Sequence, residues 1–312
     1  MAPPMALRRS ALDLIGDTPL LTLDRLHPGP GTLLAKAEFL QPGGSVKDRA
    51  AKRILELARA QGALQRGQPV VEMTSGNMGA GLAVVCNVLG HPFTAVMSAG
   101  NSPARARMMR DLGAEVELVA QVDGAPGNVT GKDIAAAAAR AQTLAKERRA
   151  YYVDQFHNPG SVLAHAEGTG PELWRDTEGR LDAFVAIVGS GGTFVGTSRF
   201  LKHQDPRVRC VAVEPVGAEV LAGKPLTKAR HVLQGTGYGS VPPLWDPKLA
   251  DGFAAVTDAE AEEFRRRLAT EEGLHVGFSS AANVCAAARE LRDLGRPEAW
   301  VATVLCDTGL KY

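Results

Sequence analysis

The sequence lacks the features that mark several specialised classes of protein. Lysine and arginine number 35 against 34 aspartates and glutamates, so the formal net charge is only +1. Without a basic field, the chain has nothing to attract nucleic acid or an acidic membrane surface. No apolar run approaches the length of a transmembrane helix, and residues 1–10 hold no apolar block of the kind a secretory signal needs. These absences give no support to nucleic-acid binding, membrane insertion or secretion.

Cysteine and histidine are also scarce. The four cysteines form no Cys-x-x-Cys pair, and each stands among apolar residues; they are Cys86, Cys210, Cys285 and Cys306. This pattern predicts buried, reduced thiols in a cytosolic protein. The seven histidines are scattered, with no His-Glu-x-x-His motif or Cys/His cluster, so we expect no metal site.

What the sequence does contain is an alternation of short strands and helices. Strands are expected at residues 33–37, 69–73, 93–97, 115–119, 151–153, 184–188, 209–213 and 300–305. Helices are expected from about residue 50 to 61, and up to 89, then at 103–112, 134–146, up to 203, 258–272 and 281–294. Such alternation predicts an α/β fold with mainly parallel sheets covered by helices.

The length of 312 residues is sufficient for two domains. We place the best boundary near residue 150. This gives a smaller domain of residues 40–150 and a larger domain of residues 10–39 with 151–312. Polar loops on both sides suit a shared cleft, which is a common place for a small-molecule site.

The octapeptide PGGSVKDR at residues 42–49 places a lysine at the expected start of a helix. Ser45 is the expected N-cap, and Asp48 completes a capping-box-like pair. Lys47 then lies in the first turn, where the helix dipole disfavours positive charge. Such a place suits a neutral amine that forms a Schiff base. The alternative is an ordinary solvated lysine among the neighbouring basic residues.

The sequence VGSGGT at residues 188–193 follows a strand and opens a helix. Backbone N–H groups in such a glycine turn form an anion nest, to which Ser190 and Thr193 add hydroxyl donors. The dinucleotide fingerprint fails because its last glycine is replaced by Phe194, and no Gly-Lys-Ser/Thr pattern occurs. A compact monophosphate fits best. The alternative is a tight turn that needs glycine only for packing.

Two further polar turns precede helices. Residues 74–79 (TSGNMG) offer a second anion site, of a size for a carboxylate; the alternative is a helix start capped by Ser75 or Asn77. Ser279 and Ser280 place hydroxyls at another helix start. Together these parts provide a lysine amine, a phosphate cradle, a carboxylate cradle and a hydroxyl donor. This combination suits pyridoxal 5′-phosphate and an amino acid.

The chain resembles the cysteine synthase/cystathionine β-synthase family of fold type II pyridoxal-phosphate enzymes, which are tryptophan synthase β-like. The resemblance follows the chain in order through residues 16–20 (GDTPL), 42–49, 74–77, 155–159 (QFHNP), 168–174 (GTGPELW), 188–193, 212–215 (AVEP), 271–274 (EEGL) and 277–280 (GFSS). It implies an active site in the cleft between the domains, with residues 40–150 as the mobile domain that closes over the substrate and the larger domain holding the cofactor phosphate.

The resemblance also implies roles for individual residues. Lys47 forms the internal aldimine with the cofactor and acts as general base. Asn77 binds the phenolate oxygen of the cofactor, and Ser279 meets its pyridine nitrogen. The implied phosphate ligands are Gly189, Ser190, Gly191, Gly192 and Thr193. The implied substrate-binding residues are Thr74, Ser75, Gly76, Met78, Gln155 and Gly235, the last in a cleft-lining loop of residues 235–238.

The implied reaction is β-replacement on an O-activated L-serine through an α-aminoacrylate intermediate, with sulfide giving L-cysteine. Residues 235–241 contain no arginine to receive a phosphate leaving group, which favours O-acetylserine. The alternatives are a different nucleophile such as homocysteine, a serine/threonine deaminase-type elimination, and a catalytically silent binding protein. The resemblance further implies a homodimer, and a C-terminal tail beyond Tyr312.

Several departures from the family pattern bear on the substrate. Met78 stands where threonine is usual, and Ala281 where glycine is usual. Residues 124–133 form a longer loop than the family pattern has. Tyr238 resembles the cystathionine β-synthase branch more than the sulfhydrylase branch. These departures leave the nucleophile open.

Overall fold

The computed structural model describes residues 7–127 and 129–311. Residues 1–6, Asn128 in the loop that departs from the family pattern, and Tyr312 lie outside the described residues.

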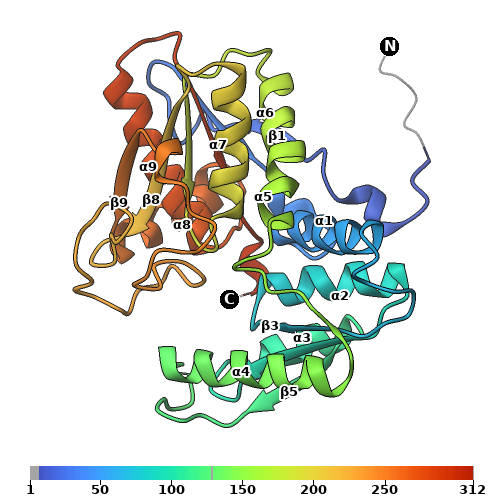
Figure 1. The fold of residues 1–312 in the computed structure, drawn as a ribbon. Coiled ribbons are helices and arrows are strands. Elements are labelled where there is room, and N and C mark those ends of the chain that lie inside the picture. The colour runs from blue at the N-terminus through green and yellow to red at the C-terminus, as the bar shows by residue number, and fades with distance from the viewer. Residues whose placement is uncertain (1–6, 128, 312) are drawn as a thin grey trace. The chain divides into compact units, whose positions relative to one another are not determined.

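The chain separates into two compact units (Figure 1). Unit 1 consists of the residues up to Asp17, Gln41–Gly43 and Lys47–Asp154. Unit 2 consists of Thr18–Leu40, Gly44–Val46 and the residues from Gln155 onward. The chain therefore passes between units twice just before Lys47. That one unit closes over a substrate stays a prediction.

Unit 1 is built on a parallel sheet with strand order β5-β4-β3-β6. Its strands are β3 (Val70–Met73), β4 (Phe93–Ser98), β5 (Glu115–Val119) and β6 (Tyr151–Tyr152). Its helices are η1 (Ala11–Leu14), α1 (Lys47–Ala60), α2 (Asn77–Leu89), α3 (Pro103–Asp111) and α4 (Gly131–Glu147).

Successive residues of the unit 1 strands enter two different apolar clusters. Val70 and Ala95 pack in the cluster that includes residues of α1, α2 and α3. Their neighbours Val71 and Val96 pack with Ala141 and other residues of α4. Because side chains alternate across a strand, these strands are buried on both faces. Parallel strands covered in this way have nearly continuous apolar sequences, and this is the pattern that predicts them here.

Unit 2 is built on a larger sheet of order β1-β2-β10-β7-β8-β9, parallel except that β1 pairs antiparallel with β2. Its strands are β1 (Leu20–Thr22), β2 (Thr32–Lys36), β7 (Ala183–Ile187), β8 (Arg209–Pro215), β9 (Gly252–Val256) and β10 (Trp300–Val304). Its helices are η2 (Glu38–Leu40), α5 (Gly160–Ala164), η3 (His165–Thr169), α6 (Gly170–Asp176), α7 (Gly192–Gln204), η4 (Pro247–Leu249), α8 (Asp258–Glu271), α9 (Phe278–Leu294) and η5 (Gly309–Lys311).

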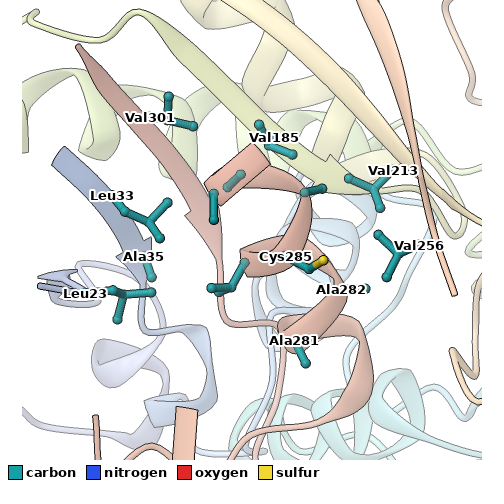
Figure 2. Packing of buried hydrophobic residues seen from close by; sticks show 14 of the residues in the cluster. Leu23, Leu33, Ala35, Val185, Val213, Val256, Ala281, Ala282, Cys285 and Val301 are labelled. Carbon is teal, nitrogen blue, oxygen red and sulfur yellow. The ribbon is translucent and has the colours of Figure 1, made fainter. Parts of the chain in front are cut away.

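The unit 2 sheet is likewise covered on both faces. Leu33, Val185 and Val301 pack against the small residues of α9, as Figure 2 shows. The neighbouring Phe184 and Ala302 pack in a second cluster that includes residues of α6 and α7. The sequence of α9 is rich in alanine, which allows the helix to lie close to the strands.

Most of the predicted strands and helices are confirmed to within a few residues, but three segments were missed or misplaced. The helical stretch from Gly160 to Asp176 was not predicted, nor was β9, and α9 begins at Phe278 instead of Ala281. The glycines and prolines of the first stretch resemble helix breakers. In the structure, a Cβ on Gly170 would lie 2.8 Å from Cβ of Phe200 in α7, so this glycine permits close helix packing.

Candidate active site

Lys47 is the first residue of α1 and is half-buried. The predicted place of this lysine in the first helical turn is therefore confirmed. The carboxylate of Asp48 accepts a hydrogen bond from the Gly43 backbone N–H. A Cβ on Gly43 would lie 2.6 Å from Asp48 Oδ1, so only glycine allows this approach. Asp48 thus fixes the loop that precedes the lysine, instead of only completing a capping box with Ser45.

The three residues just before Lys47 are anchored within unit 2 to the end of β10. The Val46 N–H donates to the Cys306 carbonyl at 2.8 Å, and the Thr308 N–H donates to the Gly44 carbonyl at 3.2 Å. Ser45 forms an antiparallel bridge with Asp307. The backbone that leads into Lys47 is therefore held on both sides of the unit boundary.

The turn after β3 begins α2 in unit 1. The N-cap is Gly76, which makes no side-chain cap, so neither Ser75 nor Asn77 is the N-cap of this helix. Thr74 does the capping instead, because its Oγ1 accepts from the Gly79 N–H at 3.0 Å. The backbone N–H of Ser75 donates no hydrogen bond to the backbone within the described part of the chain. The half-buried Ser75 side chain keeps a donor available at this turn.

Met78 does not lie open at this turn. Its side chain is 3% exposed and packs in the main apolar cluster of unit 1. The predicted contact of Met78 with a substrate stays a prediction, and its burial gives that contact no support. Ala281, the second unusual residue, is fully buried in the apolar cluster of unit 2, where its methyl group adds to the core (Figure 2).

The glycine turn after β7 has the geometry of an anion nest. Gly191 is the N-cap of α7 with φ +98°, a left-handed conformation that favours glycine. A Cβ on Gly189 would lie 2.4 Å from the Gly235 carbonyl oxygen, so this position also requires glycine. Within the described residues, the N–H groups of Gly191, Gly192 and Thr193 donate no backbone hydrogen bond. They stand at the positive end of a 13-residue helix.

Two buried residues that sequence reasoning missed orient the nest. His165 Nε2 lies 3.2 Å from Thr193 Oγ1, and His165 Nδ1 lies 2.8 Å from Thr169 Oγ1. Both His165 and Thr169 are almost fully buried in a π-helical turn of the kind often found at functional sites. The two ring nitrogens of His165 therefore connect Thr169 to Thr193 at the nest. His165 and Thr193 lie 28 positions apart in the sequence, so no local motif indicated their contact.

Ser279 lies in the first turn of α9 and is half-buried, whereas Ser280 is fully buried. The Asp307 N–H lies 3.5 Å from Ser280 Oγ. Only Ser279 is therefore placed to meet a ligand. One turn later on the same helix face, Asn283 accepts from the Ile187 N–H at 2.6 Å and donates to the Val304 carbonyl at 2.8 Å. Asn283, also missed, joins the ends of β7 and β10.

The remaining predicted residues lie in loops of unit 2. Gly235 has φ +82° and is exposed. Gln155 is half-buried, and its carbonyl accepts from the Ser161 hydroxyl at 3.3 Å. Tyr238 packs edge-on against Phe156, with ring centroids 5.6 Å apart. This aromatic pair joins the loop of residues 235–238 to the segment that follows Gln155.

The cysteine prediction is confirmed for three of the four thiols. Cys86, Cys210 and Cys285 are buried and free, and Cys306 is half-buried and free. Burial raises the pKa of Cys86 to about 12 and that of Cys210 to about 11, so these thiols stay protonated and unreactive near neutral pH.

Neither a membrane-spanning helix nor a metal-binding cluster is found among the described residues. No helix within residues 7–127 and 129–311 is long and apolar enough to cross a membrane. In that same part of the chain, no group of three His, Cys, Asp or Glu side chains is arranged to hold a metal ion.

The donor set of the nest fits a phosphate monoester. It offers backbone N–H groups at a helix N-terminus together with the hydroxyls of Ser190 and Thr193, and such groups bind phosphate well. Lys47 and Ser279 each stand at the start of a helix, as predicted for the residues that contact pyridoxal phosphate. These features define a pyridoxal-phosphate enzyme of the α/β class.

Comparison with known proteins agrees with this class. The chain belongs to the family described as pyridoxal-phosphate dependent enzymes, whose model matches residues 11–307. Cysteine synthase 3 of Caenorhabditis elegans is 39% identical over 277 residues, which cover 88% of this chain and 79% of the relative. A cysteine synthase of Staphylococcus aureus is 36% identical over 301 residues, which cover 96% of this chain and 93% of the relative.

Solved structures of similar proteins cover nearly the whole chain. O-acetylserine sulfhydrylase isoform 3 from Entamoeba histolytica matches with a TM-score of 0.90 and 32% identity, covering 100% of this chain and 92% of that one. An O-acetylserine dependent cystathionine β-synthase from Helicobacter pylori matches with a TM-score of 0.89 and 32% identity, covering 99% and 98%. The predicted family, the α/β fold of type II and the pyridoxal-phosphate cofactor are thereby confirmed.

Proposed function

We propose that this enzyme catalyses β-replacement on O-acetyl-L-serine, with sulfide as the nucleophile and L-cysteine as the product. The observation that carries the proposal is the similarity to cysteine synthases at 36–39% identity over 88–96% of the chain. Two features of the structure support it: the glycine turn at the start of α7, proposed for a phosphate, and the polar turn at the start of α2, proposed for a carboxylate.

When bound, pyridoxal phosphate withdraws electrons from the amino acid's Cα, which makes the Cα proton acidic. Lys47 Nζ would hold the cofactor, then take this proton and later return it. Departure of the proton from Cα and of acetate from Cβ opens Cβ to attack by sulfide. The start of a helix favours the neutral amine that this work requires.

The other proposed roles follow from the donors that each residue offers. The N–H groups of residues 189–193 and two hydroxyls would hold the cofactor phosphate. Ser279 would meet the pyridine nitrogen, and Asn77 the phenolate oxygen. A hydroxyl is a weaker acid than a carboxylic acid partner, so the ring nitrogen would stay largely unprotonated, which suits elimination. The substrate would be bound by Thr74, Ser75, Gly76, Gln155 and Gly235.

A second candidate differs only in the nucleophile. One of the similar solved structures is named an O-acetylserine dependent cystathionine β-synthase, and Tyr238 resembles that branch. A thiol amino acid such as homocysteine would then replace sulfide. We further propose a cytoplasmic homodimer; the buried thiols support a reducing compartment, and the family resemblance supports the dimer.

Product analysis tests the proposed function. The purified protein, supplied with pyridoxal phosphate, is incubated with sulfide and with O-acetylserine, O-phosphoserine or serine, and cysteine is quantified. We expect cysteine mainly from O-acetylserine. Pyruvate as the main product in the presence of sulfide would favour a deaminase, and no turnover of any serine derivative would favour the silent binding protein.

A further inference from the structure

The longer loop after β5 is the feature that the proposed function leaves unexplained. We refer to its described residues, 121–127, 129 and 130, as the 121–130 loop. It connects β5 to α4 in unit 1.

A single buried carboxylate orders this loop. Asp133 is 1% exposed. Its Oδ1 accepts from the N–H groups of Val122 (2.7 Å) and Asp123 (3.3 Å). Its Oδ2 accepts from the Thr130 N–H (2.9 Å), the Thr130 hydroxyl (3.1 Å) and Gln121 Nε2 (3.4 Å). Both ends of the loop are therefore fixed to one side chain. These hydrogen bonds, the one from the Thr130 backbone N–H above all, hold the pKa of Asp133 well below its usual range.

The loop folds back toward the predicted carboxylate site. The Gly127 N–H donates to the Gly100 carbonyl at 2.9 Å, in the turn that follows β4. A Cβ on Gly100 would lie 2.3 Å from Gln121 Nε2, so the loop rests directly on that turn. β4 lies between β5 and β3, and β3 leads into Thr74. Because these three strands are parallel, the loop after β5 and the turn at Thr74 after β3 lie at the same edge of the sheet.

The loop offers a short apolar side chain and a carboxylate to its surroundings. Val122 is 63% exposed. Asp123 is 48% exposed and lies 3.4 Å from Lys132, which is 75% exposed. A surface pair of this kind contributes little to stability, so Asp123 can be replaced without unfolding the protein.

We propose that the 121–130 loop, held by Asp133, selects the nucleophile: it admits sulfide and disfavours thiols that are bulky or carry a carboxylate. The inference rests on the proposed function. A fixed loop at the same sheet edge as the turn at Thr74 restricts the volume that a second amino acid would need. Asp123 repels a thiol's carboxylate. Asp133 is a positioning residue, and Asp123 is a specificity residue.

The first test measures kcat/KM with O-acetylserine for sulfide and for L-homocysteine. We expect Asp133→Asn to lower the preference for sulfide by about tenfold, because the amide replaces an acceptor by donors and frees the loop. The matched control is Glu260→Gln. Thr257 and Glu260 form the same capping box on α8 that Thr130 and Asp133 form on α4. Loss of the carboxylate charge at this helix start in unit 2 should leave the preference unchanged.

The second test uses two thiols of similar size, thioglycolate and 2-mercaptoethanol. Asp123→Asn is a surface substitution that we expect to fold normally. It should raise the relative use of thioglycolate by about two- to fivefold. If Asp133→Asn shows no cooperative thermal transition, and so does not fold, the result with Asp123→Asn tests the proposal alone.

The outcomes are distinguishable. Failure of the wild-type enzyme to form cysteine from O-acetylserine and sulfide would refute the proposed function and the inference with it. Cysteine formation with nucleophile preferences that neither Asp133→Asn nor Asp123→Asn alters would refute the inference alone.

Discussion

Gly189 is the residue whose missing side chain most directly shapes the phosphate nest. Its backbone approaches the Gly235 carbonyl so closely that a Cβ would lie 2.4 Å from the oxygen. A side chain at position 189 would therefore force the backbone there and the backbone at Gly235 to move apart. The same contact connects the nest to the exposed loop of residues 235–238, so the two loops hold one another in place.

Gly189→Ala should therefore weaken cofactor binding. Overpacking of this kind costs about 1–3 kcal/mol, which corresponds to a roughly five- to hundredfold loss of affinity. Titration of the apoprotein with pyridoxal phosphate, followed by absorbance, measures it. Gly131→Ala is the control, because a Cβ there meets nothing within 4 Å. Equal affinities for the two variants would show that the Gly189–Gly235 contact does not shape the nest.

At this scale the sequence was most informative where chemistry requires one residue type. Lys47 and the glycine turn could be predicted because a Schiff base needs a lysine amine and a phosphate nest needs glycine backbone, each at the start of a helix. His165 and Asn283 could not, because their roles depend on contacts with residues that are 28 and 96 positions away. Met78 shows the converse: its position beside the turn suggested a ligand contact, whereas its side chain packs in the core.

Helix α4 is the element in which sequence and structure are most tightly coupled. The capping box of Thr130 and Asp133 starts the helix at Gly131, three residues before the expected start at Ile134. The sequence did not show that the same carboxylate also holds the loop before it, since a capping pattern carries no information about residues nine or more positions upstream.

The charge of Asp133 predicts how stability depends on pH. The folded-state pKa lies below the ordinary value of 3.8, so the contribution is complete above that value and is lost as the pH falls through the lowered folded-state pKa. The difference in free energy of unfolding between wild type and Asp133→Asn should stay constant from about pH 5 to about pH 8. Urea unfolding at several pH values measures this difference. A difference that declines within that range would contradict the assignment.

The helical stretch from Gly160 to Asp176 could not be predicted because its glycines act through tertiary contact. A Cβ on Gly196 in α7 would lie 2.2 Å from the Val162 carbonyl oxygen. Close approach of these helices requires glycine on each, and a pattern based on local propensity treats such glycines as breaks.

At the scale of the whole molecule, a buried cation ties distant parts of unit 2 together. Lys36 on β2 is fully buried. Its Nζ lies 2.9 Å from Glu172 and 3.4 Å from Asp176 on α6, and it donates to the Thr18 carbonyl at 2.8 Å. Sheet, helix and the entry of the chain into unit 2 meet at this one amine.

Lys36→Ala should destabilise the protein by about 3–5 kcal/mol, because it removes this cation from beside the buried carboxylate of Glu172. Chemical denaturation measures the change. Arg207→Ala is the control, since its pair with Asp205 lies on the surface, and its free energy of unfolding should hardly change. If both variants unfold at the same denaturant concentration, the Lys36 cluster does not stabilise unit 2.

The two units divide the proposed chemistry between them. Unit 1 carries Lys47 and the turn at Thr74; unit 2 carries the phosphate nest and Ser279. Alternating strands and helices predicted the α/β architecture because both sheets are covered on both faces. The path of the chain, which crosses between units just before Lys47, was not predicted, because it depends on the long-range pairing of residues 44–46 with residues 306–308.

The proposed mechanism depends on Lys47, which would hold pyridoxal phosphate and move the proton at Cα. Its sharpest test is the visible absorption spectrum and cysteine formation of Lys47→Ala after supply of the cofactor. Lys52→Ala is the matched control, because Lys52 lies on the same helix and donates to the Leu12 carbonyl. We predict that Lys52→Ala keeps both the visible band and activity, and that Lys47→Ala loses both. A Lys47→Ala enzyme that retains the band and forms cysteine would contradict this mechanism.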